Sequence, residues 1–340
     1  MKRILVFMLV LMFALSLVGC GGDKKPAAGS KEAPKGEYKA NLKVTMTQVV
    51  THPYAVGAKK FGDLLKERTN GRIQVTVYTD SQLAKGEREM LEALQQGTID
   101  IYVGSTGPVG NFSPSMLIVD IPFLFRDFNH VDKVLDGPIG KQLLADMDKT
   151  GLKGLAFWEN GFRHVTNNKG PVKVPADAKG MKIRTMENKA HMLAFKTAGL
   201  NPTPMAWSEV YSALQQKVID GQENPVAVFY GSKMNEIQKY FSLTGHVYSP
   251  ALFVVSMKKW NQIPKADQEI IEKTAKEVAA FERKLNRDDE EKKLKEMEGK
   301  GLVITRDVDK SAWQKAMQPA FDEFAKQFGK DKIDAIINTK

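Results

Sequence analysis

The stretch from Leu42 to Val103 indicates the class of fold, because strand-like and helix-like patterns alternate along it. Its strand-like runs are Leu42-Lys-Val-Thr-Met-Thr-Gln48, Arg72-Ile-Gln-Val-Thr-Val-Tyr78 and Ile99-Asp-Ile-Tyr-Val103. Two segments with helical spacing, opened by Pro53 and Gly86, separate these runs. A strand–helix–strand–helix–strand order favours parallel strands joined by right-handed crossovers. We therefore expect an α/β fold.

The segments that follow predict a second lobe and a hinge. We interpret Leu152–Trp158 as a further strand of the first lobe, and Glu159–Gly161 as the break where the chain crosses over. The chain would cross back near His246–Pro250, before the apolar strand Ala251–Ser256. Lobe I would then hold residues 41–161 and about 250–285, and lobe II residues 162–249 and about 286–340.

Lobe II is expected to contain a strand and two helices that matter for function. The strand is Met181–Thr185, and the first helix lies near Ala190–Ala198, where Gly199 ends it. We expect Ser208 to cap the second helix, with Val218 at the end of its buried stripe.

A long helix is predicted from Lys265 to about Glu298, because this stretch contains no proline or glycine. Its first part has apolar residues at helical spacing, whereas Asn286–Lys293 is wholly charged or polar. We expect one helix that lies across both lobes, packs at each end and is solvated between. Aromatic and methionine residues at helical spacing between Trp313 and Phe328 predict a last amphipathic helix.

The N-terminus has the pattern of an export signal. Met1-Lys-Arg3 precedes an apolar run, and Gly19 stands before Cys20, the single cysteine of the chain. This arrangement resembles a bacterial lipobox, which predicts a signal peptide at 1–19, lipidation of Cys20 and a flexible tether over 20–40. The alternative is an ordinary signal peptide with an incidental cysteine. The prediction is an extracytoplasmic, lipid-anchored protein without disulfides.

The charge balance favours small anionic partners over nucleic acid. The formal net charge of the chain is +10. About +6 belongs to the folded part, once Lys2, Arg3 and the tether's five lysines and three acidic residues are set aside. Basic and acidic residues are interleaved, without the basic and aromatic clusters of nucleic-acid platforms. We expect no nucleic-acid partner.

The sequence lacks the motifs of common catalytic and cofactor sites. It contains no His-Glu-x-x-His, no Gly-x-Ser-x-Gly and no Gly-x-x-x-x-Gly-Lys-Ser/Thr. Gly104–Gly110 has the wrong spacing for a dinucleotide loop, so we interpret it as a ligand-side loop after a strand. The five histidines lie far apart in the sequence. We therefore expect no metal, no cofactor and no enzymatic activity.

Arg184 is the leading candidate for ligand binding. A guanidinium is a poor general acid near neutrality, but its planar fork can hold both oxygens of a carboxylate. The alternative is a surface arginine. Met181, Ile183 and Met186 argue against it, because they indicate a buried setting that charges rarely enter without a partner.

Three further residues complete a possible carboxylate site. Arg163 is either a second anion contact or part of a surface ion pair. Trp207 precedes a helix and so can face a cleft, whereas packing in the core is its alternative. Asn224 follows the turn signal Asp220-Gly221, and its amide either donates to the carboxylate or serves the turn.

Several motifs together resemble a known family. They are Ile121-Pro-Phe-Leu-Phe125, Asn160-Gly-Phe-Arg163, Gly180-Met-Lys-Ile-Arg184, Pro204-Met-Ala-Trp-Ser-Glu-Val-Tyr211 and Asp220-Gly-Gln-Glu-Asn-Pro225. From about Leu42 to Phe328 the chain resembles the solute-binding subunits of tripartite ATP-independent periplasmic (TRAP) transporters, in the DctP-like branch. This resemblance implies a two-lobed, Venus-flytrap periplasmic-binding-protein fold, braced by a long helix. It also implies delivery of organic acids to a membrane permease driven by an ion gradient.

The resemblance assigns roles to individual residues. It makes Arg184 the clamp for the ligand carboxylate, and it makes Arg163 and Asn224 ligand contacts. Thr47 and Ser105 stand where the sialic-acid members carry an asparagine and a glutamate, which argues against sialic acid. We expect these two residues, with His52, to select the remainder of the ligand. A C4-dicarboxylate or a small hydroxy or keto acid is favoured, with sugar acids and aromatic acids as alternatives.

Two other functions are compatible with the sequence. The protein would be a receptor that presents its ligand to a membrane sensor kinase, or, less favoured, an enzyme whose cleft performs acid–base chemistry. The enzyme hypothesis is weak because no His, Cys or Ser is predicted to lie beside a base.

Overall fold

The structure is a computed structural model that describes residues 37–340. The predicted signal peptide, Cys20 and nearly all of the predicted tether lie outside the described residues. Within residues 37–340, no helix combines the length and apolar character needed to cross a bilayer.

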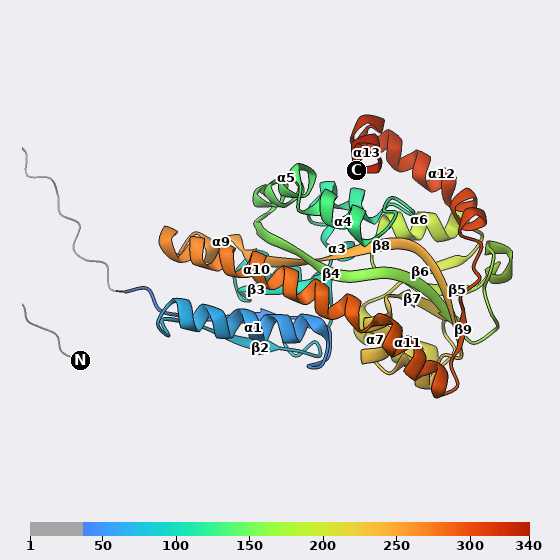
Figure 1. Cartoon of the computed structure of the whole chain (residues 1–340), viewed down its shortest axis with the longest axis horizontal. Coiled ribbons are helices and arrows are strands. Elements are labelled where there is room, and N and C mark those ends of the chain that lie inside the picture. Colours follow the sequence, from blue (N-terminus) through green and yellow to red (C-terminus); the bar gives the residue numbers. More distant parts are fainter. Residues whose placement is uncertain (1–36) are drawn as a thin grey trace, which may run out of the picture. The chain divides into compact units, whose positions relative to one another are not determined.

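A nine-stranded sheet runs through the described residues in the order β2-β1-β3-β8-β4-β7-β5-β6, with β9 paired to β8 (Figure 1). At one end, β1 (Ala40–Thr45) lies parallel between β2 (Ile73–Tyr78) and β3 (Ile101–Ser105). The crossover helices are α1 (Pro53–Arg68) and α2 (Glu87–Gln96). The predicted parallel α/β arrangement of this half, which we call lobe I, is confirmed.

Two long antiparallel strands, β4 (Leu152–Asn167) and β8 (Tyr240–Ser256), run through both halves of the sheet. The strand break predicted at Glu159–Gly161 is wrong, because β4 continues through it. The register against β8 shifts there, and Gly161 has a φ of 121°, a conformation that favours glycine. His246–Pro250 likewise lies inside β8 rather than in a connection. A bulge interrupts the period-two pattern of a strand, which explains the error.

The other half of the sheet, lobe II, is built from short strands. In it β5 (Lys182–Thr185) lies parallel between β6 (Asn201–Pro204) and β7 (Gly221–Asn224), and β7 pairs antiparallel with β4. The strand β9 (Val303–Thr305) lies parallel to β8. The helices that follow β5, β6 and β7 are α6 (Lys189–Thr197), α7 (Trp207–Gln215) and α8 (Val226–Gly231).

Two details predicted for α7 are wrong. Its N-cap is Ala206 rather than Ser208, because the helix already begins at Trp207. Val218 is 54% exposed, since the helix ends at Gln215 and the chain turns before β7.

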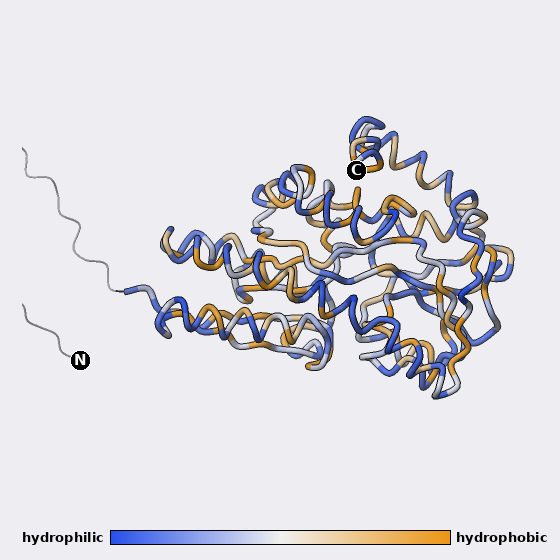
Figure 2. Tube along the Cα trace, viewed as in Figure 1, coloured by the Kyte–Doolittle hydropathy of each residue, from blue (hydrophilic) through white to orange (hydrophobic). Residues whose placement is uncertain are grey.

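The remaining elements cover the sheet. They are α3 (Thr106–Val109), α4 (Phe128–Leu135), α5 (Pro138–Asp146), α9 (Met257–Trp260) and short 3-10 helices at Pro114–Asp120, Met147–Thr150, Pro175–Ala178 and Met234–Glu236. Apolar residues gather along the strands and on the inner faces of the helices (Figure 2). Separate clusters of buried apolar residues lie in lobe I and in lobe II.

The predicted long helix runs from one half of the sheet to the other, but it is interrupted. The helix α10 (Lys265–Asp288) packs on α1 and β4, and after Asp289 the helix α11 (Glu290–Gly299) packs on α8 in lobe II (Figure 1). The expectation that Asn286–Lys293 is solvated is wrong in part, because Asn286 is buried; Glu282 and Arg283, just before this stretch, are buried as well. Their partners are polar groups of β4 and α4, which the helix sequence alone does not reveal.

The C-terminal helices confirm the predicted amphipathic segment. The helix α12 (Lys310–Phe328) buries Trp313 and Met317 against the apolar residues of α6. The last helix, α13 (Lys330–Ile337), returns to α4, where the carbonyl of Ile336 lies 2.8 Å from Nε2 of His130. The C-terminal helices therefore pack on α4, which precedes the predicted crossing at Glu159–Gly161, and on α6, which follows it.

Candidate functional site

A small polar cavity lies where the two halves of the sheet meet. Its volume is about 20 Å³, room for about one water molecule. Six of the seven ligand-binding residues predicted from the sequence line it: Thr47, Ser105, Arg163, Arg184, Trp207 and Asn224. Its other lining residues are Gln48, Tyr54, Glu87, Asn160, Met186 and Val228.

The topology explains why these residues converge. Thr47 follows β1, Ser105 ends β3, Arg184 is in β5 and Asn224 ends β7. The carboxyl ends of parallel strands meet at one edge of a sheet, where open α/β sheets bind ligands. The long strand β4 adds Arg163 from the middle of the molecule.

Arg163 is fully buried and held by a carboxylate. Its Nε donates to Oε2 of Glu223 at 2.5 Å, and its Nη2 donates to Oε1 of Glu223 at 2.8 Å and to the Glu223 carbonyl at 2.7 Å. Nη2 also donates to Oδ1 of Asn224 at 3.0 Å. Nη1 is buried and has no hydrogen-bond partner among residues 37–340. The alternative of a surface ion pair is therefore wrong, and one nitrogen of Arg163 is left for a further acceptor.

Glu223 is the fixed counter-charge of this site. Burial opposes its ionisation, but Arg163 and His246 outweigh burial and hold the pKa of the carboxyl well below its usual range. Nε2 of His246 lies 3.1 Å from Oε2 of Glu223, and Nδ1 of His246 lies 2.8 Å from Oγ1 of Thr244. Glu223 is therefore a carboxylate at neutral pH, and it positions Arg163 rather than acting as a base.

Arg184 is buried as predicted, and the surface alternative is wrong. Its Nε and Nη2 both donate to the carbonyl of Met205, at 3.0 and 2.6 Å, while its guanidinium carbon lies 5.4 Å from the ring centroid of Trp207. Burial lowers the pKa of Arg184 to about 10, so the group stays charged at neutral pH. Trp207 lines the cavity as expected, although it is the first residue of α7 rather than a residue before the helix.

Asn224 is oriented by its neighbours. Its Oδ1 accepts from Arg163, and its Nδ2 donates to Oε1 of Gln222 at 2.5 Å. An amide nitrogen carries two protons, so one remains for a ligand acceptor.

Lobe I contributes neutral polar side chains and one carboxyl group, that of Glu87. Oε1 of Glu87 accepts from the hydroxyl of Tyr102 at 3.0 Å and from the Ser105 amide at 3.3 Å. Burial raises the pKa of Glu87, while Tyr102 and Arg184 oppose that rise. The atoms Gln48 Oε1 and Tyr54 Oη are buried without a partner in the described part of the chain.

Ser105 and His52 both form hydrogen bonds that stabilise the local backbone or neighbouring strands. Oγ of Ser105 lies 2.8 Å from Oγ of Ser249 and accepts from the Gly107 amide at 3.3 Å. His52 caps α1, with Nδ1 accepting from the Tyr54 amide at 3.2 Å, and it does not line the cavity. Burial lowers the pKa of His52 to about 3, so it is neutral at physiological pH.

Glu87 and Tyr54 line the cavity but were not predicted from the sequence. Each lies in the first turn of its helix, and each helix begins beside the edge of the sheet where the site forms. A glutamate in a first helical turn is common for electrostatic reasons, so its position alone does not signal a binding role.

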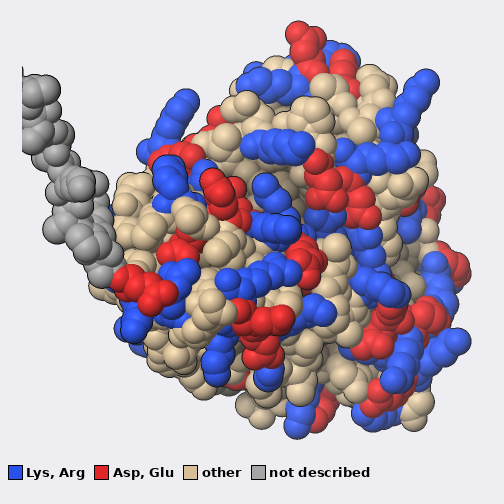
Figure 3. Space-filling view, turned by 60° about the vertical axis from the view of Figure 1, so that its left-hand side comes forward, with Lys and Arg blue, Asp and Glu red and all other residues tan. Residues whose placement is uncertain are grey.

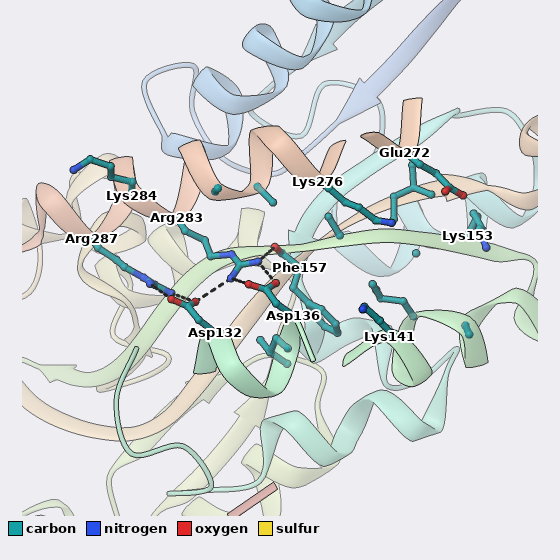
Figure 4. Close-up of a pocket in the computed structure, with 18 of the residues that line it drawn as sticks. Asp132, Asp136, Lys141, Lys153, Phe157, Glu272, Lys276, Arg283, Lys284 and Arg287 are labelled. Carbon is teal, nitrogen blue, oxygen red and sulfur yellow. Dashed lines mark hydrogen bonds and ion pairs between the residues drawn. The ribbon is translucent and has the colours of Figure 1, made fainter. Parts of the chain in front are cut away.

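A separate and larger groove lies between α10, α5 and β4. Its volume is about 830 Å³, and its lining includes Lys141, Lys153 and Lys276. At one end of this groove Arg283 and Arg287 reach from α10 to Asp132 and Asp136 of the α4 region (Figure 4). These ion pairs join α10 to α4.

The described residues contain no group of three or more His, Cys, Asp and Glu side chains placed to hold a metal ion. The face seen in Figure 3 carries interleaved lysine, arginine and acidic side chains. That face has no extended area of a single charge.

The fold and the site together indicate the class of protein. A polar cavity between the two halves of an α/β protein, lined by two buried arginines, is a typical place for a small-molecule site. The family model described as "Bacterial extracellular solute-binding protein, family 7" (DctP) matches residues 45–327, and the chain belongs to this family. It is a DctP-like solute-binding protein of the TRAP type, as its motifs predicted.

Individual relatives are similar over most of their length. The 2,3-diketo-L-gulonate-binding periplasmic protein of Escherichia coli (strain K12) is 40% identical, over 83% of this chain and 86% of the relative. A TRAP periplasmic solute-binding protein from Polaromonas sp. JS666, solved with D-erythronate, is 46% identical, with a TM-score of 0.87 over 89% of this chain and 99% of that chain. One from Sulfurospirillum deleyianum, solved with succinate, is 36% identical, with a TM-score of 0.84 over 89% of this chain and all of that chain.

Proposed function

We propose that the protein captures a carboxylate-bearing organic acid outside the cytoplasm and delivers it to a TRAP-type permease driven by an ion gradient. The observation that carries this proposal is the buried pair Arg163 and Arg184 in one cavity. Glu223 faces Arg163 directly, whereas the hydrogen bonds of Arg184 go to a carbonyl. A carboxylate would supply the second negative charge.

The binding residues have distinct roles in this proposal. Arg184 clamps the carboxylate, Nη1 of Arg163 and the free N–H of Asn224 complete its hydrogen bonds, and Trp207 walls the pocket. Thr47 and Ser105 face the rest of the ligand from lobe I. We leave His52 out of this set because it caps α1.

The acids named for the relatives support a carboxylate ligand for this chain, but they do not identify which acid it binds. The acids named for the relatives include D-erythronate, 2,3-diketo-L-gulonate and succinate, all of which carry at least one carboxylate. Both hydroxy acids and C4-dicarboxylates therefore stay candidates. The proposal also includes lipid anchoring through Cys20 and a periplasmic or outer-face location. It further includes the absence of catalysis. The membership in a transport family favours the permease over a sensor kinase as partner.

A thermal-shift panel tests the proposal. A ligand that binds only the native state raises the melting temperature. We expect organic acids to raise it and their uncharged analogues, such as erythritol in place of erythronate, to leave it unchanged. The proposal would be contradicted if only the uncharged polyols raised the melting temperature, or if no acid raised it.

A further inference from the structure

Hydrogen bonds join the loop that follows Arg184 to lobe I. Residues 186–188 connect β5 to α6 in lobe II, and Met186 lines the cavity. The segment of lobe I that faces this loop follows β3 and includes α3 and the 3-10 helix Pro114–Asp120. The two segments approach closely, because a Cβ built on Gly107 would lie 2.6 Å from Cε of Met186. Contacts between them therefore connect the lobes beside the cavity.

Asn188 makes the central contact of this interface. Its Nδ2 donates to Oδ2 of Asp120 at 2.9 Å and to the carbonyl of Gly107 at 3.1 Å, both in lobe I. Its Oδ1 accepts from the amides of Ala190 and His191, at 2.8 and 3.0 Å, and so caps α6. An amide nitrogen carries two protons, and both are used here. Asn188 therefore joins the two lobes and keeps no proton for a ligand.

Asp120 is held in place by its own lobe. Its Oδ1 accepts from Oγ1 of Thr106 at 2.9 Å, and both residues are fully buried. Burial raises the pKa of Asp120 to about 7, although the hydrogen bond from Thr106 and the charge of Arg163 oppose that rise. A carboxyl oxygen can accept a hydrogen bond in either protonation state. The bond from Asn188 therefore does not depend on the ionisation of Asp120.

A second hydrogen bond between the lobes lies at the surface. Nδ2 of Asn111, in lobe I, donates to the carbonyl of Glu187 in lobe II at 2.6 Å. The carboxylate of Glu187 also lies 3.8 Å from Nη1 of Arg88, but 60% of the arginine side chain is exposed. An exposed ion pair of this kind contributes little. The hydrogen bonds of Asn188 and Asn111 are therefore the main polar contacts of this loop with lobe I.

Contacts between the lobes affect how a ligand enters and leaves. The cavity of about 20 Å³ has no room for an organic acid, so ligand exchange requires movement around it. Hydrogen bonds that span the two lobes are lost when the lobes separate, and they favour the closed arrangement. Each such bond therefore lengthens the time for which a bound acid stays enclosed.

We infer that Asn188 is a positioning residue for ligand binding: its amide holds lobe I against the loop that follows Arg184 and slows the release of the bound acid, with Asn111 assisting at the surface. This inference rests on the proposed function, because it takes the cavity as the ligand site. It goes further by assigning the stability of the closed arrangement to residues that do not line the cavity.

The variant Asn188→Ser separates the two roles of Asn188. Serine is about as good an N-cap as asparagine, so the cap of α6 is kept, but its shorter side chain cannot span the distance to Asp120. Release of D-erythronate and of succinate is measured by stopped-flow tryptophan fluorescence, because Trp207 lines the cavity. We expect the dissociation rate constant to rise at least about fivefold, as for one lost buried hydrogen bond, and the association rate constant not to fall.

Asn111→Ala is the second variant, because an exposed side chain can be removed with little risk to folding. We expect it to raise the dissociation rate constant about two- to fourfold. Asn201→Ala is the matched control, since Nδ2 of Asn201 donates to the carbonyl of Gly180 at 3.0 Å and both residues belong to lobe II. The control should release both acids at the wild-type rate.

The outcomes separate this inference from the proposed function. A wild-type dissociation rate in folded Asn188→Ser would overturn the inference, and Asn111→Ala decides in the same way if Asn188→Ser does not fold. Equal acceleration in Asn201→Ala, or an affinity loss that comes only from slower association, would also count against it. Failure of every acid in the thermal-shift panel would instead refute the proposed function.

Discussion

At the scale of single residues, the site depends on a buried arginine and carboxylate pair. Arg163 and Glu223 are both fully buried, and the carboxylate occupies two of the three guanidinium nitrogens. Removing one partner of such a pair leaves an uncompensated buried charge, which typically costs more than the pair itself contributes. Glu223 thus leaves Nη1 as the guanidinium nitrogen of Arg163 that has no partner within residues 37–340, and we propose that this nitrogen contacts the ligand.

The pair predicts a pH-dependent loss of stability. Because the pKa of Glu223 is lower in the folded protein than in the unfolded chain, its contribution is full above the unfolded pKa of about 4.3 and is lost as the pH falls below that value. We expect Glu223→Gln to destabilise the protein by about 3 kcal/mol at pH 7. In urea unfolding, the difference from wild type should shrink as the pH falls from about 5 to 3.

Glu291→Gln is the control for this experiment, because Glu291 forms an exposed pair with Arg306. It should change the free energy of unfolding by less than about 0.5 kcal/mol at every pH. A Glu223→Gln difference that is equally large at pH 7 and pH 3 would argue against the assigned ionisation.

The sequence predicted the residues of the site unevenly. Arg184 and Trp207 could be predicted as site residues because the local sequence pattern indicates the end of a strand and the start of a helix. The burial of Arg163 was left open, since its partner Glu223 lies on another strand and only the fold brings the two together. Glu87 was not predicted as a site residue because glutamate is common in the first turn of a helix.

At the scale of elements, ion pairs tie α10 to α4 and β4. Nη1 of Arg283 donates to Asp132 and Asp136, both at 2.9 Å, and Nη2 donates to Asp136 at 2.6 Å and to the Phe157 carbonyl at 3.2 Å. Arg287 adds bonds to Asp132 and Glu159. A network with a buried arginine is worth more than isolated surface pairs.

We expect Arg283→Ala to lower the free energy of unfolding by about 2 kcal/mol. The value lies below that of a fully buried pair, because Asp136 and Asp132 are partly exposed and regain water. Urea denaturation of Lys284→Ala is the comparison, since its neighbouring pair with Asp288 is exposed and should be worth less than about 0.5 kcal/mol. Equal effects of the two substitutions would show that the network does not brace the helix.

This network also explains why one element was mispredicted. From the sequence, the charged stretch after Leu285 indicated a solvated middle of the long helix. Within that stretch, Asn286 donates to the Glu159 carbonyl and Arg287 pairs with Asp132 and Glu159, partners from β4 and α4 that a helical pattern cannot reveal. The α/β order of lobe I was predictable, because each strand and helix there carries its own periodicity.

At the scale of the whole molecule, the two halves share a sheet and meet at the binding cavity. The strands β4 and β8 and the pair α10–α11 connect both halves. A cavity of about 20 Å³ is too small for a four-carbon acid, so ligand entry requires the halves or the lining side chains to move. Closure is then favoured by the contacts that only the closed arrangement makes, those of the ligand among them.

The most direct test is calorimetric titration of Arg184→Lys with an acid that binds the wild-type mature protein. Lysine keeps the charge but loses the planar fork, so we predict a loss of at least about 2 kcal/mol, roughly thirtyfold in Kd. Arg88→Lys, at an arginine whose side chain is 60% exposed on α2, should bind as the wild type does. Wild-type affinity in Arg184→Lys would contradict the assignment of Arg184 as the carboxylate clamp.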